Sequence, residues 1–251
     1  MNKRALITGA SSGIGFAYAK YLTKKDWHLD LVSNNKERSE ESRTSLDYKK
    51  ASFYTADLSK NESIRNIIDK FETPDLIVAN AGVAINGPIG KLTDEEKSKA
   101  YYLMCGGVIE LIEGFVPRMI DKGTGRIVII SSIGAISPMP KSSIYSSIKS
   151  GIYAYGKSIA AELSDKEINV TVSLPGYVKT SAHKRVGLEH LHSKVPSWMW
   201  VTPEKVVIET EKASRKGKNE IVPGMVYKIA KPFLKSNAAV NLWKKITKRS
   251  Q

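Results

Sequence analysis

Short apolar runs alternate with segments of helical periodicity along this 251-residue chain, and the alternation restricts its fold more than any other feature. The apolar runs, each a predicted strand, are residues 4–8, 29–32, 51–56, 76–79, 126–131, 170–174 and 221–222. The predicted helices are residues 14–25, 59–71, 93–119, 145–163 and 203–214. Strands separated by helices pair in parallel, because each helix carries the chain back across the sheet. The sequence therefore predicts an α/β fold, a doubly wound parallel sheet in a single domain, with ligands bound beyond the carboxyl ends of the strands.

Three segments depart from this alternation. Residues 34–50 are polar and are predicted as a loop or an irregular helix. Residues 178–200 have no clean period and are predicted as a mobile substrate lid, and residues 230–251 as a basic C-terminal extension. The longest stretch without a charged residue, 76–90, has 15 residues, too few for a membrane-spanning helix.

The N-terminus and the cysteine usage indicate a compartment. Residues 1–4 lead directly into the first predicted strand without the cleavage site of a signal peptide. A single cysteine, Cys105, excludes an internal disulfide and a multi-cysteine metal site. We therefore expect a cytoplasmic protein in a reducing compartment.

Basic residues outnumber acidic ones, with 39 Lys and Arg against 25 Asp and Glu and a formal net charge of +14. Six cations lie in the last 21 residues, where there is no acid: Lys231, Lys235, Lys244, Lys245, Lys248 and Arg249. The other cations are scattered among acids, and no nucleic-acid-binding motif is present. We interpret the excess as a solvated basic tail and expect no nucleic-acid partner.

The tail also contains apolar residues at roughly helical spacing, namely Ile229, Phe233, Leu234, Val240, Leu242, Trp243 and Ile246. Our first interpretation is that they close over a ligand site or pack on a partner subunit, because such residues usually belong to a core. The alternative is a basic amphipathic segment that lies on an anionic membrane surface. Pro232 and Asn241 argue against one continuous helix.

The segment Thr8-Gly9-Ala10-Ser11-Ser12-Gly13-Ile14-Gly15 joins the first predicted strand to the first predicted helix. Without a Cβ, Gly9 and Gly13 can turn tightly and let backbone N–H groups approach a pyrophosphate, which the helix N-terminus also favours. Gly15 allows close helix packing. An ordinary glycine turn is the alternative, but this spacing at a strand–helix junction predicts a dinucleotide site. Its predicted contacts are Gly9, Ser11, Ser12, Gly13, Ile14 and Gly15.

Tyr145 and Lys149 are separated by four positions, so both side chains lie on one face of the predicted helix. A tyrosine hydroxyl has a pKa of about 10, and an ammonium group beside it favours the phenolate, which suits Tyr145 to proton transfer at neutral pH. The spacing alone is not specific, because three other pairs share it: Tyr21/Lys25, Tyr153/Lys157 and Tyr227/Lys231.

Together with further motifs in the right order, these features resemble the short-chain dehydrogenase/reductase family over about residues 3–225. The resemblance implies a Rossmann-type fold and an oxidoreductase that transfers a hydride between a nicotinamide cofactor and a carbonyl or alcohol substrate. It assigns Ser132, thirteen residues before Tyr145, to the hydrogen bond with the substrate oxygen. It makes Tyr145 the catalytic acid/base and Lys149 the residue that lowers the Tyr145 pKa and binds the nicotinamide ribose.

The further motifs imply cofactor contacts. Asp57-Leu58, after the third strand, matches the pair that contacts the adenine in the family, although Asp57 or Ser59 can also cap the following helix. Asn80-Ala81-Gly82, after the fourth strand, matches the Asn-Asn-Ala-Gly motif with Ala79 in place of the first Asn. The segment that touches the nicotinamide carboxamide in the family is matched by Pro175, Gly176, Val178 and Thr180.

The end of the second strand predicts which cofactor binds. A carboxylate there would accept hydrogen bonds from the 2′-hydroxyl of NAD and repel the 2′-phosphate of NADP. The chain has the neutral Ser33 instead, followed by the potential phosphate donors Asn34, Lys36 and Arg38. We therefore predict NADP as the cofactor, and NAD as the less favoured one.

One departure from the family concerns proton relay. Counting back from residues 116–119, the position of the relay asparagine is occupied by Met104, whose thioether cannot hold a relay water. A cofactor-binding sensor or scaffold with low turnover is therefore an alternative to the enzyme. The resemblance also implies a homodimer or homotetramer, joined through the helices that begin near Thr93 and Tyr145.

Two further clusters suggest ligand contacts. An apolar carbonyl or alcohol substrate could contact Ile136, Met139, Val186, Trp198, Met199 and Trp200, although packing of a lid onto the core explains these residues equally well. His183, His190 and His192 lie near Glu189, but an i, i+2 pair does not share a helix face and no cysteine assists. We predict no metal site.

Overall fold

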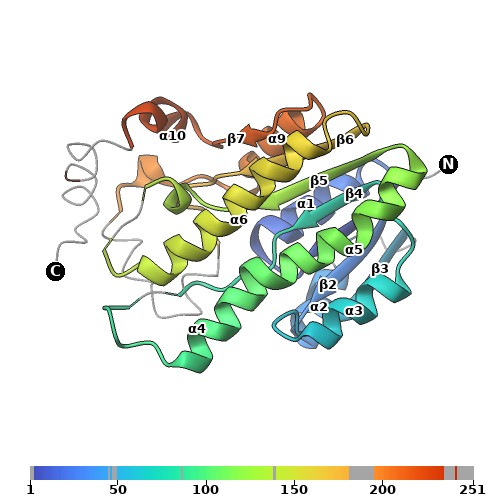
Figure 1. The fold of residues 1–251 in the computed structure, drawn as a ribbon, viewed down its shortest axis with the longest axis horizontal. Coiled ribbons are helices and arrows are strands. Elements are labelled where there is room, and N and C mark those ends of the chain that lie inside the picture. The colour runs from blue at the N-terminus through green and yellow to red at the C-terminus, as the bar shows by residue number, and fades with distance from the viewer. Residues whose placement is uncertain are drawn as a thin grey trace.

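A parallel sheet forms the centre of the computed structural model, which describes residues 3–44, 46, 50–85, 87–137, 140–180, 195–234 and 241. Its strands are β1 (Arg4–Thr8), β2 (His28–Ser33), β3 (Ala51–Thr55), β4 (Leu76–Ala79), β5 (Gly125–Ile130), β6 (Ile168–Ser173) and β7 (Glu220–Ile221). In the described residues the sheet is seven-stranded, with the order β3-β2-β1-β4-β5-β6-β7 (Figure 1). The chain leaves β3 at one edge and re-enters beside β1, so the winding reverses between β1 and β4. This confirms the predicted doubly wound parallel sheet, and its ligand crevice is expected at that reversal.

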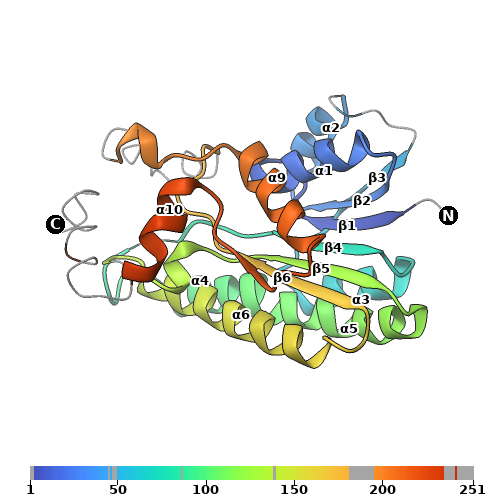
Figure 2. The same ribbon diagram turned by 90° about the horizontal axis from the view of Figure 1, so that it is seen from above.

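Helices cover both faces of the sheet (Figure 2). One face carries α1 (Gly13–Thr23), α2 (Lys36–Thr44) and α9 (Pro203–Ser214). The other carries α3 (Asn61–Lys70), α4 (Asp94–Tyr101), α5 (Gly107–Lys122) and α6 (Ser143–Glu162). The shorter elements are the π-helix η2 (Tyr102–Gly106), the turns η3 (Ile133–Ala135), η4 (Ser197–Met199) and η5 (Lys231–Phe233), and the helix α10 (Met225–Ala230).

The strands are buried on both faces, and successive residues enter different cores. Leu6, Ile77 and Ile127 belong to the core under α3, α5 and α6, whereas their neighbours in sequence face α1 and α9. All four residues of β4 are buried. Continuous apolar runs rather than alternating ones are expected for a parallel sheet covered twice, which is why the sequence pattern identified the strands.

The predicted helical region over 93–119 is present, and its middle is a π-helix. A capping box formed by Thr93 and Glu96 starts α4 as the sequence suggests. The chain then widens into η2, where the N–H of Gly107 donates to the carbonyl oxygen of Tyr102, five residues earlier. A Cβ on Gly107 would lie 3.1 Å from that oxygen and 3.2 Å from the carbonyl oxygen of Leu58, so a glycine permits this packing.

Two local predictions also change. The polar segment 34–50 contains a regular helix, α2, whose start is stabilised by the side chain of Asn35, an acceptor for the Arg38 N–H at 2.7 Å. The prediction that Asp57 or Ser59 caps α3 is wrong, because Lys60 occupies that position. Asp57 Oδ1 instead accepts from the Ser59 N–H and hydroxyl, at 3.0 and 2.7 Å.

The lid prediction for 178–200 and the extension prediction for 230–251 fall largely outside the described residues. The described ends of the lid segment lie together, because Val178 pairs with Val201 in a short parallel bridge. Among the described residues, no helix has the length and apolar character needed to cross a membrane.

Candidate active site

A cavity of about 390 Å³ opens at the carboxyl ends of the strands, beside the reversal between β1 and β4. Its floor begins at the glycine turn after β1. Gly9 and Gly13 have φ angles of +65° and +57°, a region that residues with a Cβ rarely adopt. A Cβ on Gly15 would lie 2.4 Å from the Gly9 carbonyl oxygen and 2.5 Å from Asn80 Nδ2. The turn therefore requires glycine at these positions, and it leaves backbone N–H groups and the start of α1 facing the cavity.

The end of β4 holds this turn in place. Asn80 Nδ2 donates to the carbonyl oxygens of Thr8 and Gly9, at 2.9 and 3.2 Å. The Thr8 hydroxyl oxygen in turn accepts from the N–H groups of Asn80 and Ala81, at 2.9 and 3.0 Å. Four hydrogen bonds thus join Asn80 and Ala81 to the turn, and the sequence analysis did not identify the contribution of Thr8 to them.

The structure brings nearly all residues of the predicted site to this one cavity. The lining includes Gly9, Ser11, Ser12, Gly13, Ile14, Ser33, Asn34, Asp57, Leu58, Asn80, Ala81, Gly82, Ser132, Tyr145, Lys149, Pro175, Gly176, Val178 and Thr180. Gly15 does not line the cavity and lies behind the turn, where it contacts Gly9. The segments that follow β1, β4 and β5 therefore meet α6 at one cavity, although they are far apart in the sequence.

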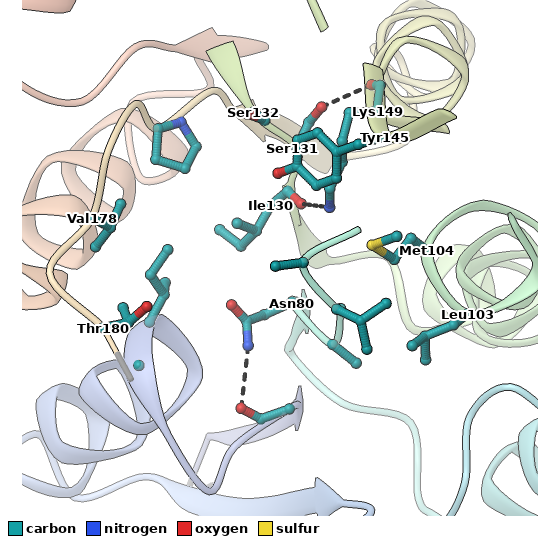
Figure 3. Close-up of a pocket in the computed structure, with 18 of the residues that line it drawn as sticks. Asn80, Leu103, Met104, Ile130, Ser131, Ser132, Tyr145, Lys149, Val178 and Thr180 are labelled. Atoms are coloured by element: carbon teal, nitrogen blue, oxygen red, sulfur yellow. Dashed lines mark hydrogen bonds between the residues drawn. The ribbon is translucent and has the colours of Figure 1, made fainter. Parts of the chain in front are cut away.

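Ser132 and Tyr145 meet at Gly134. A Cβ on Gly134 would lie 3.4 Å from Ser132 Oγ and 3.6 Å from Tyr145 Cε1, so both side chains face the same small space. The Ser132 hydroxyl oxygen also accepts from the Gly134 N–H at 3.1 Å, which fixes its direction. Figure 3 shows Ser132, Tyr145 and Lys149 on one wall of the cavity, opposite Val178 and Thr180.

Lys149 is a buried cation in this wall, only 6% exposed. Its Nζ donates to the Ile130 carbonyl oxygen at 3.0 Å, and its own carbonyl oxygen accepts from the Ser131 hydroxyl at 2.8 Å. Burial lowers the pKa of Lys149 to about 8. Nζ lies 6.0 Å from the centre of the Tyr145 ring, so the ammonium group acts on that side chain at short range.

The cavity also contains the residues at the end of β2 from which the sequence predicts NADP. The Ser33 hydroxyl donates to Ser11 Oγ at 2.8 Å, which joins the end of β2 to the glycine turn. Arg38, in the first turn of α2, lines the cavity with Asn34, whereas Lys36 does not. Among the described lining residues the only acid is Asp57, whose pKa is lowered chiefly by the hydrogen bond from the Ser59 hydroxyl.

The predicted apolar contacts are only partly described, because Met139 and Val186 lie outside the described residues. Met199 is fully buried in the core and Trp200 packs on Tyr177, with ring centres 5.5 Å apart, so these two follow the packing interpretation. Neither they nor Ile136 and Trp198 line the cavity. Its apolar lining includes residues that the prediction did not name, namely Val83, Ala84, Ile85, Leu103, Met104, Ile133 and Tyr177.

Met104 lies beside the predicted catalytic group. It belongs to η2, is 1% exposed and packs with Ala100 and Ile148 in a cluster that Tyr145 joins. A Cβ on Gly82 would lie 3.3 Å from Met104 Sδ, so the thioether fills the space next to the Asn80 motif. At the position expected for a relay asparagine, the wall of the cavity is therefore apolar (Figure 3).

Tyr227 is a site-shaping residue that the sequence analysis treated only as a chance spacing. Its ring is fully buried and occupies the space that a side chain at Gly176 would need, with a Cβ there only 2.0 Å from Tyr227 Cζ. Its hydroxyl donates to the Met199 carbonyl oxygen at 2.6 Å and accepts from the Tyr177 N–H at 2.9 Å. Nothing in the local sequence around Tyr227 signals these contacts, because they join segments 28 and 50 residues apart.

The arrangement fits a bound dinucleotide followed by a proton donor. Glycine N–H groups and a helix N-terminus can hold the phosphates at one end. A hydroxyl pair and a buried ammonium group lie at the other, where an oxygen of a second ligand can be held and protonated. The histidine cluster, His183, His190 and His192 with Glu189, lies outside the described residues.

Comparisons with known proteins point the same way. The sequence model of the short chain dehydrogenase family matches residues 3–190. A 3-oxoacyl-[acyl-carrier-protein] reductase of Rickettsia conorii is 31% identical over 81% of this chain and 86% of its own. A short-chain dehydrogenase from Sphingobium yanoikuyae in complex with NADPH superposes with a TM-score of 0.83 at 24% identity, over 96% of this chain and 95% of its own. A 4-hydroxyisoleucine dehydrogenase complexed with NADH superposes with a TM-score of 0.81 at 23% identity. The match covers 89% of this chain and 97% of that protein's chain.

Proposed function

Because the chain belongs to the short-chain dehydrogenase family, we propose that it transfers a hydride between NADP(H) and the carbonyl or alcohol group of an apolar small molecule. The observation that carries this proposal is the meeting of Ser132 and Tyr145 at Gly134, in the cavity that begins at the glycine turn. Buried Lys149 completes the group. A nicotinamide would supply the hydride when bound, and the chain supplies the positioning and the proton.

Each of the three residues has a role in reduction. The Ser132 hydroxyl donates a hydrogen bond to the carbonyl oxygen and so stabilises the negative charge that develops on it. The Tyr145 hydroxyl donates the proton that completes the alcohol, which leaves a phenolate. The Lys149 ammonium stabilises that phenolate electrostatically and has two N–H groups beyond its bond to Ile130 for the ribose hydroxyls.

NADP is the proposed cofactor because the end of β2 lacks a carboxylate and faces a cation. Ser33 is neutral and bonded to Ser11, and Arg38 reaches the cavity wall. A guanidinium group pairs well with a phosphate. The known structures similar to this chain include both an NADPH complex and an NADH complex, so the preference rests on these residues.

Cofactor titration tests this preference. We expect NADPH to bind more tightly than NADH, and Arg38→Ala to weaken NADPH binding by about tenfold through the loss of a charge-assisted pair. Lys36→Ala is the matched control and should leave both affinities unchanged, because Lys36 does not line the cavity. Ser33→Asp should reverse the preference by like-charge repulsion. Tighter binding of NADH to the wild type would contradict the proposal.

Apolar side chains around the reacting end support an apolar substrate. Val83, Ile85, Leu103, Ile133 and Tyr177 line the cavity, and Ile85 and Leu103 pack in the same cluster as Tyr145. Fatty, aromatic and steroid-like ketones fit such a lining. As in the resemblance drawn from the sequence, we also propose a homodimer or homotetramer joined through α4, α5 and α6, which light scattering of the purified protein tests.

A second candidate function follows from Met104. Its apolar packing beside Tyr145 leaves no polar side chain at the relay position. A chain that binds NADP(H) as a sensor or scaffold, with low turnover, would tolerate this. Consumption of NADPH in the presence of ketones distinguishes the two functions. An enzyme consumes NADPH over many turnovers, whereas a sensor or scaffold consumes little.

A further inference from the structure

Two serine hydroxyls in the cavity have no hydrogen-bond partner. Ser137 and Ser146 line the cavity and are only 3% and 4% exposed. In the part of the chain that the structure describes, neither Oγ atom bonds to a protein group, whereas the Ser131 hydroxyl donates to the Lys149 carbonyl oxygen at 2.8 Å. Folding removes an unpartnered hydroxyl from water without replacing its hydrogen bonds, which is unfavourable and therefore rare. Two such groups in one cavity indicate a ligand that supplies the missing partners.

Ser146 lies at the point where the proposed reacting groups meet. It directly follows Tyr145 in α6, and its Oγ is 3.7 Å from the position that a Cβ on Gly134 would take. Ser132 Oγ and Tyr145 Cε1 lie 3.4 and 3.6 Å from that same position. A ligand whose carbonyl oxygen is held by Ser132 and Tyr145 therefore places its next atoms near Ser146.

Ser137 is held close to the same turn. It follows η3, the turn that starts directly after Ser132, and its N–H donates to the Ile133 carbonyl oxygen at 3.0 Å. The turn is joined to α6, because the Ser150 hydroxyl donates to the Ala135 carbonyl oxygen at 2.8 Å. The two unpartnered serines therefore lie on segments that are fixed against each other.

The chemistry of serine indicates which ligand group fits. A serine hydroxyl donates one hydrogen bond and accepts others, so a hydroxyl of the ligand can donate to one serine and accept from the other. The wall near them is apolar, because Ile85, Leu103 and Met104 pack in the cluster that Tyr145 joins. In an apolar pocket a few polar groups select the ligand, since a ligand without the matching group leaves them unpartnered.

We propose that the substrate is a hydroxyketone, with a hydroxyl group on the carbon next to the reacting carbonyl or one carbon further, and that Ser137 and Ser146 bind this hydroxyl. The inference rests on the proposed function, in which Ser132 and Tyr145 hold the reacting carbonyl. It adds one polar group to an otherwise apolar substrate. Ser137 and Ser146 determine specificity and take no part in proton transfer.

Matched pairs of ketones test the proposal: a long-chain ketone with a hydroxyl group beside its carbonyl, and the same ketone without that hydroxyl. Consumption of NADPH gives kcat/KM for each, and the wild type should prefer the hydroxyketone by about a hundredfold. Ser146→Ala and Ser137→Ala should each lower this preference by about tenfold, because only the hydroxyketone loses a hydrogen bond. Ser147→Ala is the matched control on α6. The Ser147 hydroxyl donates to the Ile144 carbonyl oxygen at 2.8 Å and Ser147 does not line the cavity, so the preference should not change.

Thermal unfolding without ligand gives a second readout. Replacing an unpartnered hydroxyl by alanine removes no hydrogen bond from the fold, so the Tm of Ser146→Ala should equal or exceed that of the wild type. A lower Tm would mean that Ser146 is already bonded in the unliganded protein, through a bound water, and would overturn the proposal.

The kinetic outcomes separate this proposal from the proposed function. If the wild type reduces both ketones of a pair equally well, or if the preference survives in both serine variants, the substrate hydroxyl is not bound here and the proposal is overturned. If neither ketone is consumed although NADPH binds, the proposed hydride transfer fails, and the hydroxyketone proposal fails with it.

Discussion

Lys149 is a single side chain that couples the stability of this protein to its proposed chemistry. The ammonium group is buried beside Tyr145, where it can stabilise a phenolate, and it has one described hydrogen bond, to Ile130. Burying a charge costs free energy unless it is paired, and this cost appears as the lowered pKa. The site therefore contains a cation that destabilises the unliganded fold, which agrees with a position shaped for a ligand.

Removing the Tyr145 hydroxyl tests the proton donor. Tyr145→Phe keeps the ring packing and should lower turnover by about a hundredfold or more, with little change in NADPH affinity. Tyr153→Phe is the matched control on the same helix. The Tyr153 hydroxyl bonds to Glu220 at 2.5 Å, and burial together with that carboxylate raises the pKa of Tyr153 to about 12. Its loss should cost about 1 kcal/mol of stability and leave turnover intact; the reverse outcome would refute the assignment.

The pKa of Lys149 predicts how stability depends on pH. Its value in the folded chain is about 8 and its ordinary value is 10.5. Below about pH 8 both states are protonated, so the full cost of the buried charge is present. Between these values the folded lysine loses its proton first and the unfolded chain binds more protons, so stability rises with pH. Lys149→Met should therefore be more stable than the wild type by about 2 kcal/mol at pH 7, with a gap that shrinks toward pH 10.5.

Denaturant unfolding at several pH values measures this gap. Lys157→Met is the control on α6, because Lys157 is only half-buried and its Nζ donates to Asn219 Oδ1 at 2.9 Å. Its unfolding free energy should stay parallel to that of the wild type across the range. A gap for Lys149→Met that widens as pH rises would mean that the sign of the coupling is wrong.

At the scale of elements, α10 shapes the cavity through Tyr227. Tyr227→Phe removes the hydroxyl that bonds to the N–H of Tyr177 and to the carbonyl oxygen of Met199, which should cost about 1–3 kcal/mol of stability. Tyr177 directly follows Pro175 and Gly176, two of the predicted cofactor contacts. Without the Tyr227 hydroxyl this segment should be held less firmly, and NADPH should bind more weakly. Tyr155→Phe is the control: its hydroxyl bonds to Glu113, away from the cavity lining, and NADPH affinity should not change. Calorimetric titration of both variants measures the difference, and equal affinities would remove Tyr227 from the site.

The sequence predicted the elements well where burial is continuous. β4 and α9 begin and end where expected, because local signals mark both. An apolar run that ends before an Asn marks β4, and an amphipathic helix that begins with a Pro marks α9. The π-helix η2 was not predictable, because its cause is the approach of Gly107 to Leu58 in another element. The sequence also could not show that Arg38 lines the cavity and Lys36 does not, or that Tyr227 contacts the cavity wall. Such contacts depend on how segments that are distant in the sequence pack together.

At the scale of the whole molecule, the sheet places the predicted cofactor-binding and catalytic residues at one edge. The glycine turn follows β1, Asn80 follows β4, Ser132 follows β5 and Pro175 follows β6, so parallel pairing alone brings them together. The order of the motifs along the sequence was therefore sufficient to predict that these segments meet at one cavity. The apolar lining and the role of α10 were not predictable in this way, because they come from loops and from the C-terminal end of the chain.

The most direct test of the central claim is transfer of deuterium from labelled NADPH. The wild type is incubated with NADPH that carries deuterium at the transferable position of the nicotinamide, and with fatty, aromatic and steroid ketones. The account predicts an alcohol product with one deuterium on the carbinol carbon, formed over many turnovers, and almost none with Tyr145→Phe. If the wild type binds NADPH but transfers deuterium to none of these ketones, the chain is a cofactor-binding protein and the proposed reaction is contradicted.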